Sequence, residues 1–181
     1  MHGGETMDPL DLFERGTGWT ASKIPGAADQ LGDATPCADW DVRALLNHLI
    51  DSQQYFAATA RGEQASLPSP SPPASIGDDP VAAYEDIRQE TLRAYREPGV
   101  LEKTGPSLGI AFVDQLVHGW DLAKATGQDA TMPDHLAQAA FAMIDGRLTA
   151  DQRGAGFKPA VDVPDRASAQ DKLIAYTGRQ P

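Results

Sequence analysis

The apolar residues between positions 41 and 62 recur at the spacing of one helical face, and this stretch constrains the fold more than any other. It reads "DVRALLNHLIDSQQYFAATARG". Asp41 is suited to cap the N-terminus of a helix, and Gly62 is suited to end it. The residues that share the apolar face are Val42, Leu45, Leu46, Leu49 and Phe56. An apolar face of this size has to be buried, so the segment predicts a long helix packed against other elements.

Five further segments show helical spacing, and the sequence shows no convincing strand alternation and no internal repeat. Asp8-Pro9 opens the first helix, which Pro25-Gly26 closes, although Gly16 and Gly18 weaken this prediction. Ser168 is suited to cap the last helix. The predicted segments are residues 7–24, 79–99, 107–127, 134–148 and 168–178.

Residues 63–80, "EQASLPSPSPPASIGDDP", are rich in proline and serine and cannot hold a regular element. They predict an exposed crossover loop over residues 63–78. Four long amphipathic helices joined in this way indicate an all-α fold, an antiparallel four-helix bundle with one long crossover loop and small additional helices packed outside. The 181 residues suit a single domain spanning positions 1–181.

Charge and composition exclude several classes of protein. The net charge of −11 and the pI of about 4.6 argue against a nucleic-acid partner, because no basic face is present for phosphates. The single cysteine, Cys37, excludes a disulfide within the chain. No apolar run approaches the roughly 20 residues of a membrane-spanning helix, and "MHGGETMDPLDLFERG" lacks the core of a signal peptide. We therefore expect a cytoplasmic protein with no membrane partner.

Polar residues stand beside the apolar face of the helix predicted over residues 107–127. In "DQLVHGWDLAKATG", residues 114–127, Asp114 and His118 are four residues apart and lie on one side of the helix, with Asp121 close behind. His48 occupies the edge of the apolar face in the helix over residues 41–62. Two imidazoles and one carboxylate form the ligand set of many zinc and non-haem iron sites. The same pattern is also typical of simple hydrogen-bonded side chains, so spacing alone leaves both readings open.

Three stretches carry a resemblance to a known family. "TPCADWDVRALLNHL" (residues 35–49), "VHGWDLAKATGQ" (117–128) and "LIAYTGRQP" (173–181) resemble the actinobacterial branch of the DinB/YfiT-like metalloenzymes. This branch is similar to the N-terminal domain of mycothiol-dependent maleylpyruvate isomerase. The resemblance spans nearly the whole chain and implies a DinB-like four-helix bundle with a divalent metal in a pocket between helices.

The resemblance implies that His48, Asp114 and His118 hold the metal. Zinc is the first expectation, with nickel, iron or manganese as alternatives. The isomerase-like relatives usually have glutamate where this chain has Asp114, so direct contact and contact through a water are both open. Asp121 is expected to orient a ligand histidine through a hydrogen bond. Arg43 is a weaker candidate for binding an anionic part of the substrate.

The activity that the resemblance implies is the metal-dependent transfer or addition of a low-molecular-weight thiol, mycothiol, to an electrophilic substrate. The metal would bind the thiol as a thiolate. The alternatives are a metal-dependent hydrolase and a non-catalytic metal- or ligand-binding bundle. A homodimer is a further possibility. Cys37 is expected to be a small packing residue and not a nucleophile, and Trp40 is expected to pack onto the helix that Asp41 caps.

Overall fold

The computed structural model describes residues 7–153 and 157–181, and it confirms the all-α prediction. Within these residues there is no β-strand, and one isolated bridge pairs Ala34 with Asp41. The helices are α1 (Pro9–Ala21), α2 (Ile24–Ala27), α3 (Val42–Ala60), α4 (Pro80–Arg96), α5 (Val100–Ala125), α6 (Asp134–Ile144), α7 (Ala150–Arg153) and α8 (Ala169–Tyr176).

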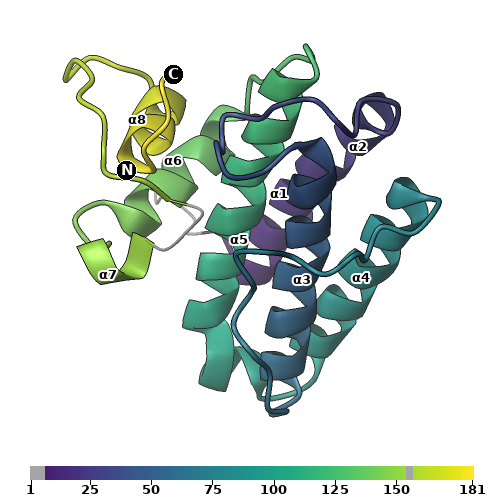
Figure 1. The fold of residues 1–181 in the computed structure, drawn as a ribbon. Coiled ribbons are helices and arrows are strands. Elements are labelled where there is room, and N and C mark those ends of the chain that lie inside the picture. The colour runs from purple at the N-terminus through teal and green to yellow at the C-terminus, as the bar shows by residue number, and fades with distance from the viewer. Residues whose placement is uncertain (1–6, 154–156) are drawn as a thin grey trace.

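The four long helices α1, α3, α4 and α5 pack against one another, and α5 contacts each of the other three. Figure 1 shows α6, α7 and α8 grouped beside α5, away from α4. The antiparallel order of the long helices stays a prediction. The predicted inward residues are buried, namely Val42, Leu45, Leu49 and Phe56 on α3 and Val113, Val117 and Trp120 on α5.

Side-chain caps begin four of the helices, and three of these caps are the ones that the sequence predicts. Asp8 accepts a hydrogen bond from the backbone N–H of Leu10, and Asp41 accepts one from Ala44. Ser168 accepts one from Asp171. At the start of α4, Asp79 accepts a hydrogen bond from the backbone N–H of Ala82. Each cap satisfies a backbone donor that the helix itself leaves free.

The first helix includes both glycines, as predicted, but it ends earlier than predicted. α1 continues through Gly16 and Gly18 to Ala21, and Pro25-Gly26 lies inside the short helix α2. A Cβ added to Gly16 would lie 2.7 Å from two ring carbons of Phe112 on α5. The missing side chain therefore lets α1 approach α5 closely, which compensates for the low helix propensity of glycine.

α5 begins earlier than predicted, because Pro106 does not end it. The helix runs from Val100 and carries Pro106 in its interior. Pro106 removes one backbone donor, but the first turns of α5 are partly exposed, so water can reach the freed carbonyl. The hydroxyls of Thr104 and Ser107 bond to the carbonyls of Val100 and Thr104.

The crossover between α3 and α4 runs along the bundle beside α3, as Figure 1 shows. Most of residues 63–78 are exposed as predicted, although Ile76 is buried. Two α3 side chains fix the loop: Asp51 accepts a hydrogen bond from the backbone N–H of Ser69, and Asn47 accepts one from Ser75 and one from Ile76. The loop is thus anchored over the part of α3 that carries His48.

Gly119 allows a second close approach of α1 and α5, directly after His118. A Cβ at Gly119 would overlap Thr20 Oγ1 and lie 3.0 Å from the ring of Trp19. We expect Gly119→Ala to lower the free energy of unfolding by about 2 kcal/mol through overpacking. Gly109→Ala on the same helix is the control, since its Cβ would only touch Met143 Sδ at 3.4 Å.

Gly109→Ala should raise the free energy of unfolding by about 0.5–1 kcal/mol, the usual gain from replacing a glycine inside a helix. Urea unfolding of both variants measures the difference. Equal effects at the two positions would contradict the close packing of α1 on Gly119.

Candidate metal centre

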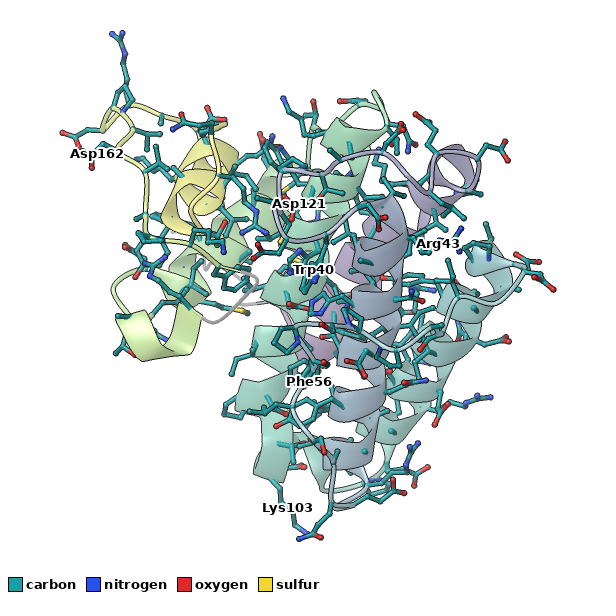
Figure 2. All side chains as sticks on the ribbon, viewed as in Figure 1. Trp40, Arg43, Phe56, Lys103, Asp121 and Asp162 are labelled. Carbon is teal, nitrogen blue, oxygen red and sulfur yellow. The ribbon has the colours of Figure 1, made fainter. Side chains whose placement is uncertain are left out.

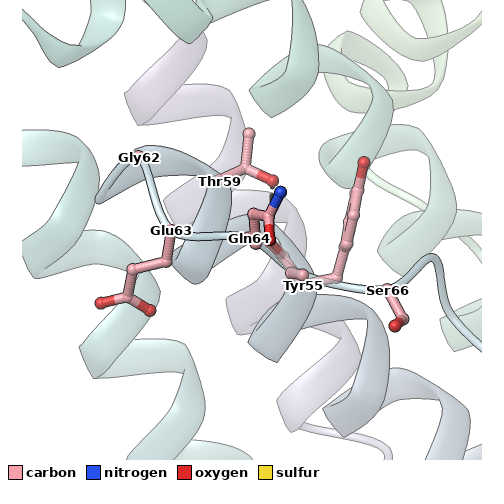
Figure 3. Close-up of a pocket in the computed structure, with 7 residues that line it drawn as sticks. Tyr55, Thr59, Gly62, Glu63, Gln64 and Ser66 are labelled. Carbon is pink, nitrogen blue, oxygen red and sulfur yellow. Dashed lines mark hydrogen bonds between the residues drawn. The ribbon is translucent and has the colours of Figure 1, made fainter.

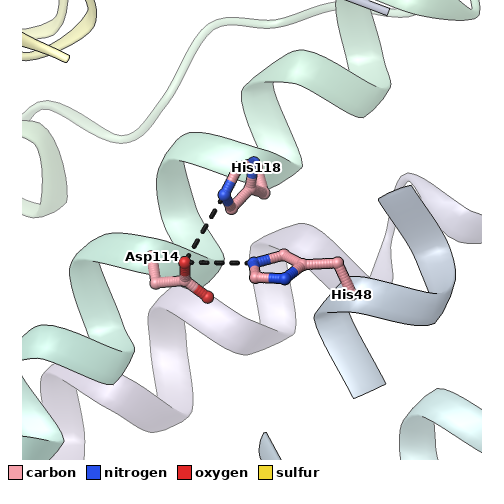
Figure 4. Close-up of side chains that lie close together, drawn as sticks. All are labelled: His48, Asp114 and His118. Carbon is pink, nitrogen blue, oxygen red and sulfur yellow. Dashed lines mark hydrogen bonds and ion pairs between the residues drawn. The ribbon is translucent and has the colours of Figure 1, made fainter. Parts of the chain in front are cut away.

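His48, Asp114 and His118 converge between α3 and α5 (Figure 4). Their candidate ligand atoms all lie within 4.8 Å of one another. His48 Nε2 lies 3.2 Å from Asp114 Oδ1, and His118 Nε2 lies 3.4 Å from the same oxygen. Asp114 and His118 are one helical turn apart, and His48 comes from the neighbouring helix. The structure therefore brings together the three residues that the sequence singles out.

The second oxygen of Asp114 is also fixed. Ser52, one turn after His48 on α3, donates its hydroxyl to Asp114 Oδ2 at 2.8 Å. Because Oδ2 is held in this way, Oδ1 faces the two imidazoles. The carboxylate is the most exposed of the three side chains, at 17%, compared with 8% for His48 and none for His118. Solvent or a ligand therefore reaches the cluster from the Asp114 side.

The arrangement fits a divalent cation on two grounds. His118 Nε2 is buried and makes no hydrogen bond of good geometry among the described residues, its contact being the 3.4 Å approach to Asp114 Oδ1. A buried polar atom that is poorly satisfied is costly, and a metal ion between these atoms would relieve that cost. Ligand bonds of about 2.0–2.1 Å in a tetrahedral site also imply ligand–ligand separations of about 3.3 Å. The two nitrogen–oxygen separations, 3.2 and 3.4 Å, bracket that value.

Asp121 supports His118 from the opposite side of the ring. Asp121 Oδ2 lies 2.9 Å from His118 Nδ1, and both side chains are fully buried. This is the hydrogen bond expected for Asp121 from the sequence. A histidine with one nitrogen held by a carboxylate and the other directed at a cluster of ligand atoms is typical of metal sites.

Arg179 is a residue of the site that the sequence analysis missed. Its guanidinium donates two hydrogen bonds to Asp121, from Nε to Oδ1 at 2.9 Å and from NH2 to Oδ2 at 2.7 Å. It is only 4% exposed. It comes from the chain after α8, 58 residues beyond Asp121, so helical spacing could not connect the two. The only signal was the place of Arg179 in the closing motif "LIAYTGRQP".

Aromatic rings enclose both histidines. Trp40 stacks on His48 with ring centroids 4.4 Å apart, and its centroid lies 5.6 Å from that of His118. Phe157 stacks on His118 at 6.0 Å. Trp40 Nε1 donates a hydrogen bond to the carbonyl of Pro70 at 2.8 Å, which ties the crossover loop to the cluster. Trp40 therefore contacts a candidate ligand as well as packing near the start of α3.

The charges of the cluster oppose the effect of burial on each ionisable group. Burial acts to raise the pKa of Asp114, but His48 and His118 outweigh it and hold that pKa well below its usual value. Burial acts to lower the pKa of His118, but Asp114 and Asp121 raise it above the ordinary value. For Asp121, burial is outweighed by Arg179, which lowers the pKa. The metal-free site is thus a buried network of paired charges.

These shifts predict how the stability of the metal-free protein depends on pH. A lowered carboxyl pKa gives stability that is present above about 3.9, the unfolded value, and is lost as the pH falls through the folded pKa. The raised pKa of His118 gives stability that is complete below about 6.5 and is lost as the pH rises through the folded pKa. We expect the contribution of the cluster to peak between about pH 4 and 6.5.

Urea unfolding with a chelator present, at a series of pH values, measures this profile. Asp114→Asn should flatten both sides of the peak, because Asp114 is a partner of both histidines. Asp162→Asn, at an exposed position away from the cluster, is the control. An Asp114→Asn profile that runs parallel to that of the wild type would contradict the assignment.

Cys37 is buried and is not activated as a nucleophile. Burial first, and then the charge of Asp121, raise the pKa of its thiol to about 11, against a lowering effect of Arg179. A thiol with a pKa this high is almost entirely protonated at neutral pH, and the thiolate is the reactive form. We expect iodoacetamide to label Cys37 slowly in the native protein and rapidly in urea, as measured by mass spectrometry. Labelling at equal rates would contradict the burial of Cys37.

Arg43 lies outside the cluster, and its role in substrate binding stays a prediction. Its side chain is exposed. It precedes His48 by five residues, which places the two about 140° apart around α3 at 3.6 residues per turn. Figure 2 shows Arg43 on the side of α3 toward α4, whereas Trp40 lies toward α5.

A polar pocket lies beyond the cluster at the C-terminal end of α3 (Figure 3). Tyr55 and Thr59 line it together with the first residues of the crossover loop, among them Glu63, Gln64 and Ser66. Tyr55 follows His48 by seven residues, or two turns, and so lies on the same face of α3 about 10 Å along the axis. The pocket and the cluster therefore share one side of this helix.

These features define the class of the protein: a helical bundle with a candidate divalent-metal site of two histidines and one aspartate. The chain belongs to the family described as the mycothiol maleylpyruvate isomerase N-terminal domain, whose model matches residues 22–123. None of the helices in the described residues is long and apolar enough to cross a membrane.

Relatives in Mycobacterium tuberculosis resemble the chain over almost its full length. The uncharacterized protein Rv0738 of strain H37Rv is 30% identical over 187 residues, covering 96% of this chain and 98% of the relative. The uncharacterized protein MT0763 of strain CDC 1551 matches with the same identity and coverage. No solved structure matches the chain.

Proposed function

We propose that the protein binds one divalent metal ion, zinc in the first place, through His48, Asp114 and His118, and uses it to transfer or add a low-molecular-weight thiol to an electrophilic carbon. The observation that carries the metal site is the convergence of His48 Nε2 and His118 Nε2 on one oxygen of Asp114, at 3.2 and 3.4 Å. Membership of the mycothiol maleylpyruvate isomerase N-terminal domain family supports mycothiol as the thiol.

The chain supplies three protein donors, which leaves coordination positions for a ligand from outside, as in catalytic sites. When bound, a divalent cation lowers the pKa of a thiol that coordinates it, so that the thiolate forms at neutral pH. His48 and His118 present nitrogen donors, and Asp114 contributes a negative charge. Trp40 and Phe157 cover the faces of the imidazole rings and keep water from them.

The surroundings of the cluster support an elongated thiol as the ligand. Asp114 is the most exposed of the three side chains, so the sulfur would enter from that side. Ser52 and Tyr55 continue the face of α3 from His48 toward the polar pocket. A thiol with a hydroxylated body could place its sulfur at the cluster and its polar end near Thr59 and Glu63. The proposal sets the reaction in the cytoplasm, where thiols remain reduced.

The metal content of protein purified without a nickel column tests the proposal. We expect about one zinc ion per chain after dialysis against zinc, measured by elemental analysis. Adding a thiol to the cobalt-substituted protein should produce a sulfur-to-metal absorption band. A protein that takes up no stoichiometric metal would overturn the proposal. Ester turnover that needs no thiol would instead favour a hydrolase.

The oligomeric state requires its own measurement, and the homodimer stays a prediction that sedimentation equilibrium checks. A chain that binds metal but turns over neither thiol nor ester substrates would point to the non-catalytic alternative.

A further inference from the structure

Arg179 is a buried charge that the C-terminal segment, residues 157–181, supplies to the candidate metal centre. All three guanidinium nitrogens donate hydrogen bonds: Nε and NH2 to the two oxygens of Asp121, and NH1 to the carbonyl of Thr177 at 2.9 Å. A bidentate arginine–carboxylate pair is geometrically specific. The pair is 3% and 0% exposed, so neither partner could be removed without leaving the other charge buried alone.

The pair determines what Asp121 can offer to His118. Oδ1 is occupied by Arg179 Nε, and Oδ2 accepts from Arg179 NH2 while lying 2.9 Å from His118 Nδ1. An oxygen of a carboxylate that is paired with arginine is an acceptor. His118 Nδ1 is therefore the donor, and Nε2 is the ring nitrogen left to face Asp114 and the metal position.

A competing arrangement is geometrically weaker. Arg179 NH2 also lies 3.5 Å from His118 Nδ1, and donation along that line would require Nδ1 to be the acceptor. His118 Nδ1 lies 2.9 Å from Asp121 Oδ2, compared with 3.5 Å from Arg179 NH2. The shorter contact also joins a donor to a full negative charge. The shorter contact decides the tautomer.

The C-terminal segment also reaches His118 from a second side. Phe157 stacks on the imidazole at 6.0 Å, and the guanidinium of Arg179 lies over the ring of Phe157 at 5.5 Å. Both residues lie beyond residues 22–123, the part that the family model matches. A segment outside the matched region thus surrounds one of the candidate ligands.

We propose that Arg179 is a positioning residue for the metal centre: through Asp121 it holds His118 with its proton on Nδ1 and its Nε2 directed at the metal position. Through Arg179, the C-terminal segment thereby sets the metal affinity of a site whose ligands all lie on α3 and α5. This inference rests on the proposed metal-binding function.

Metal affinity of the full chain tests the inference against a merely structural role. Arg179→Gln should weaken zinc binding about 10- to 100-fold, as loss of a partner behind a metal ligand typically does. Arg179→Lys keeps the charge but not the bidentate geometry and should fall between Arg179→Gln and the wild type. The d–d spectrum of the cobalt form should change in Arg179→Gln, since the orientation of one ligand is no longer fixed.

Arg153→Gln is the matched control. Arg153 also anchors the C-terminal segment, by donating to the carbonyls of Lys158 and Tyr176, and its guanidinium contacts neither Asp121 nor His118. It should lower stability while leaving zinc affinity within about two-fold, because the atoms behind His118 are unchanged. Equal losses of affinity in Arg153→Gln and Arg179→Gln would show a general effect of the segment and overturn the inference.

A measurement on the wild type keeps the inference testable if Arg179→Gln does not fold. Long-range nitrogen–proton NMR of the zinc-loaded protein should show His118 protonated at Nδ1 and bound through Nε2. Binding through Nδ1 would overturn the inference while leaving the metal site intact. Absence of zinc binding in the wild type would instead overturn the proposed function itself.

Discussion

Replacing His118 by alanine should abolish stoichiometric zinc binding. The change removes a ligand that is fully buried and held by Asp121, and the described residues place no other histidine, cysteine or acidic group in the cluster to take its position. The loss should exceed the roughly 100-fold that losing an outer partner of a ligand costs. Competition titration against a chromophoric chelator measures the affinity.

The control for His118→Ala is His135→Ala. His135 is exposed on α6 and lies outside the cluster, so this variant should bind zinc like the wild type. Asp114→Ala separates two versions of the site: a direct ligand should cost as much as His118, and contact through a water should cost less. Zinc retained at full stoichiometry in the double variant His48→Ala, His118→Ala would refute the metal site.

The cluster was predictable because its histidines occupy positions where the helical pattern is otherwise apolar. His48 and His118 interrupt faces that are otherwise built from residues such as Leu45, Leu49 and Val117. An ionisable group at such a position is either hydrogen-bonded or functional, and the spacing of Asp114 and His118 indicates a shared side. Periodicity therefore locates residues along and around one helix. The family resemblance indicated that His48 on α3 and the Asp114–His118 pair on α5 belong to one site.

The supporting residues were less predictable because their partners are distant in sequence. Gln115 bonds to Gln53, Tyr84 and the carbonyl of Leu49 in a buried network beneath the cluster. Arg179 reaches Asp121 from the chain after α8, 58 residues further along the sequence. Such contacts depend on how helices pack in three dimensions, which the spacing within a single helix does not record.

The glycines also show that packing between helices cannot be predicted from the sequence of one helix. Gly16 weakens the helix prediction when α1 is considered alone, because glycine is a poor helix former. Its role is visible only once Phe112 of α5 occupies the space of the missing side chain. Pro106 likewise lies inside α5, since a proline in a partly exposed first part of a helix does not have to end it.

Trp40→Ala should lower the free energy of unfolding by about 3 kcal/mol, the usual cost of deleting a buried aromatic side chain. Trp40 is 5% exposed and belongs to the core around α3. Its ring stacks on His48, and its Nε1 holds Pro70 of the crossover loop. The variant should also weaken zinc binding, because His48 loses the ring that fixes its plane.

Trp40→Phe separates the contribution of ring stacking on His48 from that of the hydrogen bond to Pro70. It keeps an aromatic ring against His48 but removes the donor to Pro70, so it should lose only about 1 kcal/mol, the net value of one hydrogen bond. Its zinc affinity should remain near that of the wild type if ring stacking is what fixes His48. Urea unfolding with a chelator measures the stabilities, and chelator competition measures zinc. Equal losses of zinc affinity in Trp40→Phe and Trp40→Ala would assign the effect to the crossover loop, since both variants release Pro70.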